Sequence, residues 1–457
     1  MTKQLKQRLG IFALMAICLV VGYVAANSKI LNSGFGKDIG ESKPSSKEVT
    51  AVGNKMPSPI NKDLVDEAPK EKRVLMPHID PNNPNVIKLR ADDPSKDAWR
   101  TRVDLSKFPK RAPGPINLQR YEAYLEPCGI KTFFQRPLAL TPKDLTAGKA
   151  DVAFFGAPTG ALPHSSGCMW APAEIRYTRD YGTYGASLPL GWIEYETLIN
   201  PFTIINAVDY GDAGLDPYHQ TRTLEEIRKV TREIASTGAI PFAIGGDHSV
   251  PNGTFRGIVD VYGKKKVGFV HFDAHLDRGY GKFGSYYHSG SYMTLAVKEG
   301  LLDGKQVVQF GMSTPVFGEK EWDQVLKEGG TVYHINEIRR DGVAKTFEKL
   351  YKVLEDVDKV YVSFDIDVFD NSYAPGVGSA PPTGMTPTEL FPQLRKFAAK
   401  KRIVGFDLVE YQPFYDNKGH QTARLCRRVM LQFLTGIAMM KNGMDPEYVN
   451  PRIKGRP

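Results

Sequence analysis

The sequence predicts an α/β fold in which a central, mostly parallel sheet is covered by helices on both faces. After about residue 111, short apolar and β-branched segments alternate with amphipathic segments, which is typical of parallel βαβ units. Three of the apolar segments end in clusters of aspartate and histidine, and open α/β sheets bind ligands beyond the carboxyl ends of their strands. The chain has 457 residues, of which 41% are hydrophobic and 24% charged. This composition is that of a globular protein.

The first 110 residues differ in composition from the rest of the chain. Residues 1–26 combine three basic residues with a long apolar run, the pattern of a signal peptide or of an uncleaved membrane anchor. The basic flank is expected to stay cytoplasmic, with the remainder exported or held at the membrane. Residues 27–110 are rich in polar residues and proline and are expected to form a linker, because they can bury little apolar surface. One folded domain is predicted over residues 111–457.

The formal net charge of +9 does not point to a nucleic-acid partner. The basic residues are scattered, and short basic runs are more simply explained as solvated surface. The sequence has neither zinc-finger spacing nor the aromatic motif of RNA-binding domains. The four cysteines are far apart, so neither a thiolate zinc site nor a disulfide framework is predicted.

Seven strands and four helices are predicted along the domain. The expected strands are the apolar, β-branched segments at residues 152–155, 203–208, 240–244, 267–272, 307–310, 360–364 and 403–408. The expected helices have apolar residues at helical spacing, over residues 224–236, 343–354, 386–399 and 424–440.

Three of these strands run into clusters of side chains that bind metals. GGDHS at 245–249, DAHLD at 273–277 and DID at 365–367 each follow an apolar strand. If the extended conformation continues, alternate residues of each cluster point to one side. An isolated DxD is usually a turn or strand end, and the aspartate of GGDHS alone could cap a helix. Together, four carboxylates and two imidazoles fit two divalent ions that share bridging carboxylates.

The three clusters, in this order, resemble the motifs of the ureohydrolases, the family of arginases, agmatinases and guanidino-acid hydrolases. The resemblance covers about residues 129–440 and includes four further segments, FGAP at 155–158, APAEIR at 171–176, DYGD at 209–212 and DLVE at 407–410. It implies an arginase-like three-layer fold. It also implies hydrolysis of a small guanidino compound to urea and an amine, in a homo-oligomer such as a trimer or hexamer.

The resemblance also implies roles for individual residues. It places His248 and Asp277 on one manganese ion, His275 and Asp367 on the other, and Asp273 and Asp365 between the two. Nickel or cobalt would also suit these ligands. Glu410 would hold the guanidinium group as a carboxylate, and His288 would shuttle protons to the leaving amine. His271 is expected to be structural.

The substrate is left open among agmatine, guanidinobutyrate, guanidinopropionate and guanidine. The segment after Asp277 does not resemble the arginase loop that holds an amino-acid head group. Arg278 and Lys282 are expected at the mouth of the site, where they would favour an anionic guanidino acid or a small guanidine over agmatine. The alternatives are a formimino- or other amidino-hydrolase with the same metals, and a non-catalytic binding protein that retains the fold.

Overall fold

The computed structural model describes residues 97–107, 110–120, 128–160, 163–178, 193–279, 285–316, 319–379 and 381–453. Residues 1–26, predicted as a signal peptide or anchor, lie outside this part of the chain, as does Lys282. Within the described ranges, every helix is too short or too polar to span a lipid bilayer.

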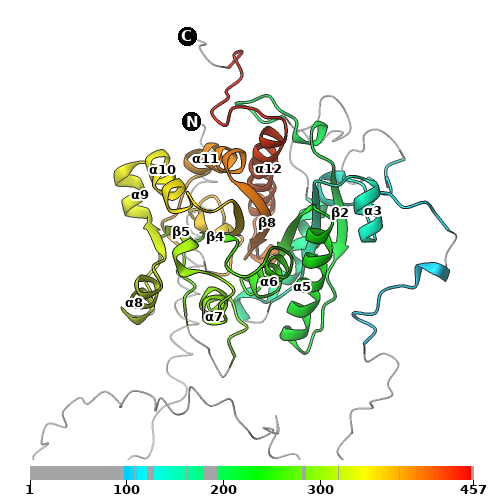
Figure 1. Ribbon diagram of the computed structural model, residues 1–457, viewed down its shortest axis with the longest axis horizontal. Coiled ribbons are helices and arrows are strands. Elements are labelled where there is room, and N and C mark those ends of the chain that lie inside the picture. The colour runs from blue at the N-terminus through cyan, green and yellow to red at the C-terminus, as the bar shows by residue number, and fades with distance from the viewer. Residues whose placement is uncertain are drawn as a thin grey trace, which may run out of the picture. The chain divides into compact units, whose positions relative to one another are not determined.

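The centre of the domain is an eight-stranded sheet in the order β2-β1-β3-β8-β7-β4-β5-β6, and its neighbouring strands are parallel (Figure 1). The strands are β1 (Val152–Ala157), β2 (Ala207–Asp212), β3 (Ile240–Gly245), β4 (Gly268–Phe272), β5 (Val307–Met312), β6 (Thr331–His334), β7 (Lys359–Asp365) and β8 (Arg402–Val409). Because all strands run in the same direction, their carboxyl ends share one edge of the sheet.

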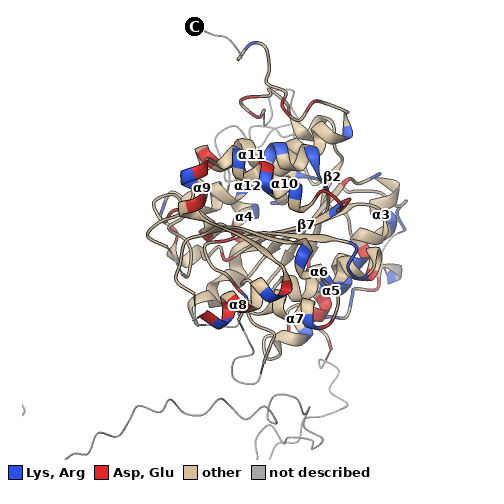
Figure 2. Cartoon of the chain, turned by 60° about the vertical axis from the view of Figure 1, so that its left-hand side comes forward, with Lys and Arg blue, Asp and Glu red and all other residues tan. Residues whose placement is uncertain are grey.

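Helices cover both faces of the sheet. Figure 2 shows it nearly edge-on, with α9, α10, α11 and α12 above it and α5, α6, α7 and α8 below. The α-helices are α3 (Pro142–Ala147), α4 (Ala171–Tyr177), α5 (Gln220–Ser236), α6 (Pro251–Tyr262), α7 (Tyr292–Lys298), α8 (Glu319–Glu328), α9 (Ile335–Asp341), α10 (Val343–Val353), α11 (Pro387–Lys400) and α12 (Gln421–Lys441). The 3-10 helices are η1 (Leu105–Lys107), η2 (Phe133–Gln135), η3 (Pro163–Trp170), η4 (Pro201–Thr203), η5 (Gly304–Gln306), η6 (Ile366–Val368) and η7 (Pro413–Tyr415).

The central strands are buried on both faces, and β7 shows how each face is packed. On one face Tyr361 lies 5.3 Å, between ring centroids, from Phe255 of α6. On the other face Phe364 lies 6.2 Å from Phe433 of α12. Side chains of a strand alternate between its faces, so a continuous apolar run such as this one serves two helical layers.

The predicted three-layer α/β fold is confirmed, with differences in single elements. β2 begins at Ala207, later than predicted, because Pro201–Thr203 form a 3-10 turn. The short edge strand β6 and helices α3, α4 and α6 to α9 were not predicted. In α6, Pro251, Gly253 and Gly257 obscure the helical pattern, because glycine and proline are poor helix formers.

Residues just before the predicted domain contact helix α5. The guanidinium of Arg222 lies 5.1 Å from the ring centroid of Trp99 and 3.0 Å from the carboxylate of Asp97. Arg102 pairs with Glu233 at 2.7 Å. The described end of the segment predicted as a linker therefore packs on the domain.

Candidate metal centre

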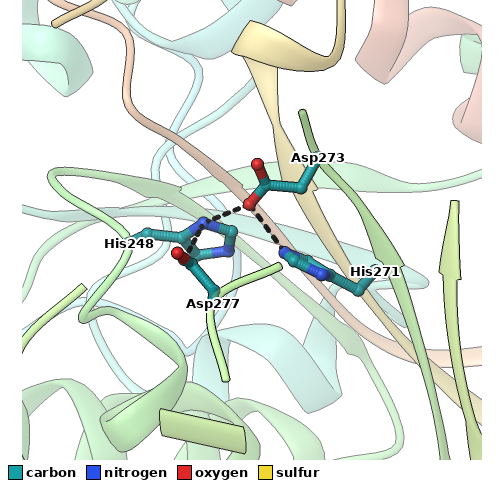
Figure 3. A group of neighbouring side chains, drawn as sticks. All are labelled: His248, His271, Asp273 and Asp277. Carbon is teal, nitrogen blue, oxygen red and sulfur yellow. Dashed lines mark hydrogen bonds and ion pairs between the residues drawn. The ribbon is translucent and has the colours of Figure 1, made fainter. Parts of the chain in front are cut away.

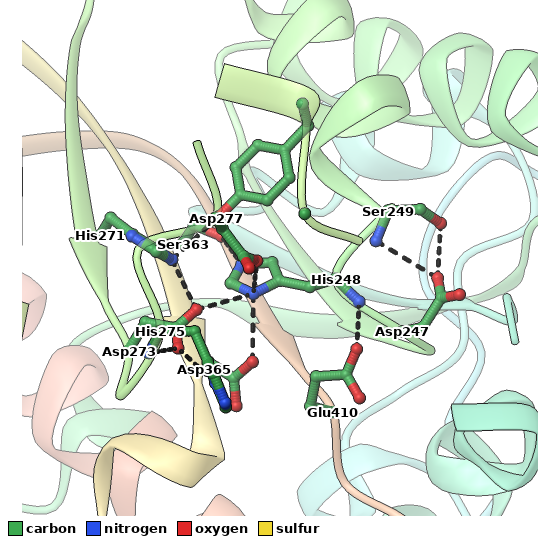
Figure 4. Close-up of polar contacts among 12 residues, drawn as sticks. Asp247, His248, Ser249, His271, Asp273, His275, Asp277, Ser363, Asp365 and Glu410 are labelled. Carbon is green, nitrogen blue, oxygen red and sulfur yellow. Dashed lines mark hydrogen bonds and ion pairs between the residues drawn. The ribbon is translucent and has the colours of Figure 1, made fainter. Parts of the chain in front are cut away.

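The predicted site residues meet at the carboxyl edge of four adjacent strands, β3, β8, β7 and β4 (Figure 4). His248 follows β3 and Glu410 follows β8. Asp365 ends β7, with Asp367 two residues later, and the DAHLD segment follows β4. Segments that are far apart in sequence are thus brought together by strand order alone.

Three carboxylate oxygens surround one imidazole nitrogen. Nδ1 of His248 lies 3.0 Å from Oδ2 of Asp273, 3.2 Å from Oδ2 of Asp277 and 3.1 Å from Oδ2 of Asp365. Figure 3 shows Asp273 and Asp277 converging on this nitrogen. Within the described part of the chain, the nitrogen is buried and makes no hydrogen bond. Such a nitrogen is a candidate metal ligand.

A second group lies beside the first and shares Asp273 with it. Nδ1 of His275 lies 2.9 Å from Oδ2 of Asp367 and 3.4 Å from Oδ1 of Asp273. The two oxygens of Asp273 therefore face different histidines, Oδ2 toward His248 and Oδ1 toward His275. This is the geometry expected of a carboxylate that bridges two ions.

A hydroxyl relay determines which nitrogen of His248 faces the carboxylates as a possible ligand. Oγ of Ser363 donates to Oδ1 of Asp407 at 2.7 Å and lies 2.9 Å from Nε2 of His248. Because the serine proton is directed to Asp407, its oxygen accepts the Nε2 proton of His248. Nδ1 is then left to bind a proton or a metal ion, as in other sites where an outer hydrogen bond orients a histidine ligand.

His271 lies close enough to this group to be considered a further ligand. The side-chain amide of Gln309 donates to its Nδ1 at 3.0 Å, so the proton of the ring is on Nε2. That nitrogen donates to Oδ2 of Asp273 at 2.8 Å. His271 therefore orients Asp273 and has no lone pair toward a metal, which agrees with the predicted structural role.

The electrostatics of the cluster favour bound positive charge. Burial raises the pKa of Asp365 and of Asp367, and neighbouring carboxylates raise both further. Burial alone would lower the pKa of His248 and of His275, but the carboxylates outweigh it and raise both. Protons on the imidazoles or metal ions would supply the charge that this cluster stabilises.

The backbone around the cluster is strained at two side-chain-bearing residues. Asp277 and Glu410 have φ angles of 49° and 62°, in the left-handed region. Each such residue costs on the order of 1–3 kcal/mol and is typical of functional sites. Gly246 has a different constraint, because a Cβ there would lie 2.3 Å from Oγ1 of Thr159. The GG pair before His248 is thus needed for close approach of the backbone.

Glu410 is buried beside His248, and both of its oxygens are held. The backbone N–H of His248 donates to Oε1 at 2.7 Å, and Oγ of Ser165 donates to Oε2 at 3.0 Å. The thiol of Cys168 lies 3.7 Å from the same Oε2. Burial and the charge of Asp247 raise the pKa of Glu410 to about 8. Ser165 and Cys168 come from η3 and were not predicted, because no local pattern connects them to Glu410.

A cavity of about 200 Å³ opens onto these residues. It is lined by His164, His248, His275, Leu276, Asp277, Gly279, Ser289, Gly290, Pro315, Val316, Glu321, Asp365, Asp367, Ser379 and Glu410. Its volume is below the range of about 300–1,000 Å³ for drug-sized ligands, so it suits a small substrate.

The predicted proton shuttle lies next to the cavity. His288 is buried, and its Nδ1 accepts a hydrogen bond from the backbone N–H of Gly290 at 3.1 Å. Its neighbours Ser289 and Gly290 line the cavity, whereas His288 is not among the lining residues.

The prediction that Arg278 lies at the mouth of the site is wrong. Its side chain is 1% exposed and pairs with Glu328, at the end of α8. Burial lowers the pKa of Arg278 to about 10. This pairing could not be predicted from the sequence, because Glu328 is far from Arg278 along the chain. Lys282, the other basic residue of that prediction, is outside the described residues.

Comparison with known proteins identifies the family of the chain. Residues 150–436 match the model of the arginase family. A guanidinopropionase from Pseudomonas aeruginosa is 31% identical over 313 residues, which are 68% of this chain and 92% of the relative. A mitochondrial agmatinase from Gallus gallus is 29% identical and is covered over 87% of its length, with 68% of this chain. The solved structure of a hypothetical agmatinase from Burkholderia thailandensis has a TM-score of 0.61 at 27% identity, covering 73% of this chain and 99% of that one. Since the family model spans more than half of its residues, the chain belongs to the arginase family.

Proposed function

We propose that this protein is a ureohydrolase that cleaves a linear guanidino compound to urea and an amine. The observation that carries the proposal is the sharing of Asp273 between two imidazole–carboxylate groups, next to the buried carboxylate of Glu410. The relatives named above act on guanidino compounds, and the cavity is small enough for such substrates.

The residues fit two divalent ions. His248 and Asp277 would hold one ion, His275 and Asp367 the other, with Asp273 and Asp365 shared. The Nδ1 of His248, which makes no hydrogen bond and faces three carboxylates, supports this assignment. Oxygen-rich ligation with two imidazoles favours manganese, and nickel or cobalt would also fit. When bound, such ions supply Lewis acidity and an activated water at neutral pH.

The remaining residues bind the substrate and move protons. Glu410, held on both oxygens, would bind the planar guanidinium as a carboxylate through paired hydrogen bonds. The positive charge of the guanidinium would offset the burial that raises the pKa of Glu410 and so favour its ionised form. His288 would protonate the leaving amine. Because its Nδ1 accepts from Gly290, the proton would be exchanged at Nε2. The reaction adds one water across the C–N bond, and the departing nitrogen takes up a proton.

The test combines metal analysis with product detection. Protein stripped by a chelator and reloaded with manganese, nickel or cobalt is assayed for urea release from a panel of guanidino compounds, with a formimino compound included. We expect two ions per chain and urea release that depends on them. The variant His275→Asn should bind fewer than two ions per chain and release no urea. His219→Asn, at an exposed histidine before α5, should keep two ions and the wild-type activity.

Two results would contradict the proposal. Metal-loaded protein that releases urea from no member of the panel would point to a binding protein, and release of formamide from the formimino compound alone would point to a formimino hydrolase. Full activity of His275→Asn would show that His275 does not hold an ion that the reaction needs.

A further inference from the structure

The wall of the cavity beside Glu410 contains a histidine that has no role in the proposed function. His164 lies in η3, is exposed, and is among the residues that line the cavity. Its imidazole makes no hydrogen bond or ion pair with another residue that the structure describes. The imidazoles of His248 and His275, which also line the cavity, are proposed metal ligands. The ring of His164 is therefore available to a substrate.

Two hydrogen bonds fasten the backbone around His164 to the segment that carries Glu410. The side-chain amide of Gln412 donates to the carbonyl oxygen of His164 at 3.1 Å. The next residue, Ser165, donates from its Oγ to Oε2 of Glu410 at 3.0 Å. A Cβ at Gly167 would overlap with the side chain of Gln412, so this close approach also needs the glycine. The position of His164 beside Glu410 is thus set by the folded backbone.

On its other side, His164 approaches the group around His275. A Cβ at Gly378 would lie 3.5 Å from Cδ2 of His164, so the imidazole packs close to the backbone there. The next residue, Ser379, lines the cavity, and its Oγ lies 3.2 Å from Nε2 of His275. His164 is therefore joined to Glu410 through Ser165 and lies near the His275 group through Ser379. A guanidinium held between Glu410 and the proposed metal ions would lie beside this part of the wall.

Glu410 alone offers too few acceptor sites for a guanidinium group. A carboxylate has about four lone-pair sites, whereas a guanidinium with one substituent has five N–H donors. The backbone N–H of His248 and the hydroxyl of Ser165 already occupy one site on each oxygen of Glu410. An N–H group that leaves water and finds no new acceptor weakens binding. The substrate therefore needs further acceptors in the wall around Glu410.

We propose that His164 is a substrate-binding residue whose neutral imidazole accepts a hydrogen bond from a guanidinium N–H beside Glu410. The inference rests on the proposed function and adds a residue to the site that holds the guanidinium. A neutral imidazole has one nitrogen lone pair that can accept this bond. The bond is made to the group that all guanidino substrates share, so it strengthens binding whatever the charge at the free end of the substrate.

Two other roles would use the same position of the ring. The imidazole could only pack on Gly378 and stabilise the wall, or its face could stack on the guanidinium without a hydrogen bond. Three substitutions separate these roles from the proposed one. His164→Gln keeps an acceptor, His164→Phe keeps a flat ring without an acceptor, and His164→Ala keeps neither.

The experiment measures kcat and KM for urea release by manganese-loaded wild type and variants. The substrates are agmatine, 4-guanidinobutyrate, 3-guanidinopropionate and guanidine. For every compound that wild type hydrolyses, we expect KM to rise on the order of tenfold in His164→Ala and His164→Phe, with kcat little changed. His164→Gln should have a KM closer to that of wild type than either. His219→Ala, at an exposed histidine that is not among the lining residues, should keep the wild-type KM.

Thermal melting of each variant separates binding from stability. An unchanged KM in His164→Ala would overturn the inference, and a lowered melting temperature in that variant would then assign the ring to packing. A wild-type KM in His164→Phe would also overturn it, because stacking would account for the effect. If His164→Phe does not fold, the comparison of His164→Gln with His164→Ala decides, and equal KM values in these two variants would contradict the hydrogen bond.

The choice of substrates separates this inference from the function on which it rests. A rise in KM that is confined to substrates with one kind of free end would place His164 at that end and contradict contact with the guanidinium. In that case urea release by wild type would still support the proposed function. Wild type that releases urea from none of the four compounds would contradict the proposed function, and this inference with it.

Discussion

Asp273 contacts both halves of the candidate metal centre. Its two oxygens face His248 and His275, and replacing it removes an oxygen from each group. We expect Asp273→Ala to bind clearly less metal than wild type and to release no urea, as measured by elemental analysis and a urea assay. Asp356→Ala, at an exposed aspartate, is the control. Two ions per chain and wild-type turnover in Asp273→Ala would show that the centre is not binuclear.

Asp144 anchors the start of the domain through its charge. It accepts hydrogen bonds from Arg111 and from the backbone of Gly114 and Thr141. Burial alone would raise its pKa, but these donors outweigh burial and hold the pKa well below its ordinary value. A depressed folded-state pKa stabilises the fold above the unfolded-state pKa of about 3.9, and this stabilisation is lost as the pH falls below it.

Asp144→Asn should therefore lower the free energy of unfolding at pH 7 by about 1–3 kcal/mol, the cost of losing charged hydrogen bonds. The difference from wild type should shrink below about pH 4, where the carboxylate of the unfolded chain is protonated. Urea denaturation at several pH values measures this difference. Asp356→Asn controls for a change in net charge, and a difference for Asp144→Asn that is constant with pH would exclude the charge effect.

The positions of site residues that belong to compact motifs could be predicted from the sequence. The residues that hydrogen-bond to them from distant segments could not. The positions of His248, Asp273 and Asp365 at strand ends follow from apolar runs followed by metal-binding side chains. Ser165 and Tyr292 contact the site from segments without a recognisable pattern, so only the folded chain shows their roles. The prediction for Arg278 was wrong for a related reason, because the direction of its side chain depends on Glu328, a partner distant in sequence.

At the scale of elements, α6 packs closely on α5 through two glycines one turn apart. A Cβ at Gly253 would lie 2.6 Å from the carbonyl oxygen of Leu224, and one at Gly257 would lie 2.7 Å from that of Arg228. The clash is with backbone, so the helices would have to separate. The two glycines therefore set the distance between α5 and α6.

Gly257→Ala should have two opposing effects of similar size on the free energy of unfolding. Alanine improves helix propensity by about 1 kcal/mol, but overpacking a tight contact costs about 1–3 kcal/mol. Because the neighbouring atoms belong to the backbone of α5, we expect a net loss of stability of about 1–2 kcal/mol in chemical denaturation. Thr221→Ala, exposed on α5, should leave stability unchanged or slightly higher. A more stable Gly257→Ala would show that the helices can move apart freely.

Helices and strands with one clear hydrophobic pattern could be predicted from the sequence. The others form because of how they pack on neighbouring elements. The buried strands read as continuous apolar runs, and α5 has apolar residues at helical spacing. Helix α6 forms despite its glycines because they allow close packing, which propensity alone does not reveal. Edge strand β6 is short and only partly buried, so its sequence lacks a clear strand pattern.

At the scale of the whole molecule, we propose that residues 1–26 direct the chain to the membrane or for export. Among the described residues, those that line the cavity or hold Glu410 begin at His164, far downstream of residue 26. Deleting residues 1–26 should therefore leave a folded protein with unchanged urea release, while the full-length chain fractionates with membranes or is exported. Activity assays and cell fractionation measure this. Uncleaved full-length chain recovered in the cytosol would contradict the targeting proposal.

Because carboxylates are crowded in the candidate metal centre, the stability of the folded chain should depend on bound metal ions. In the unfolded chain the four aspartates are hydrated and apart, whereas folding brings them around two histidines. Ions that bind only the folded chain would favour folding by mass action, adding about 1.4 kcal/mol per ion for each tenfold rise in metal concentration above its Kd. The melting temperature should then follow the metal supply and fall on chelation. Metal availability would set the lifetime of this protein as well as its activity.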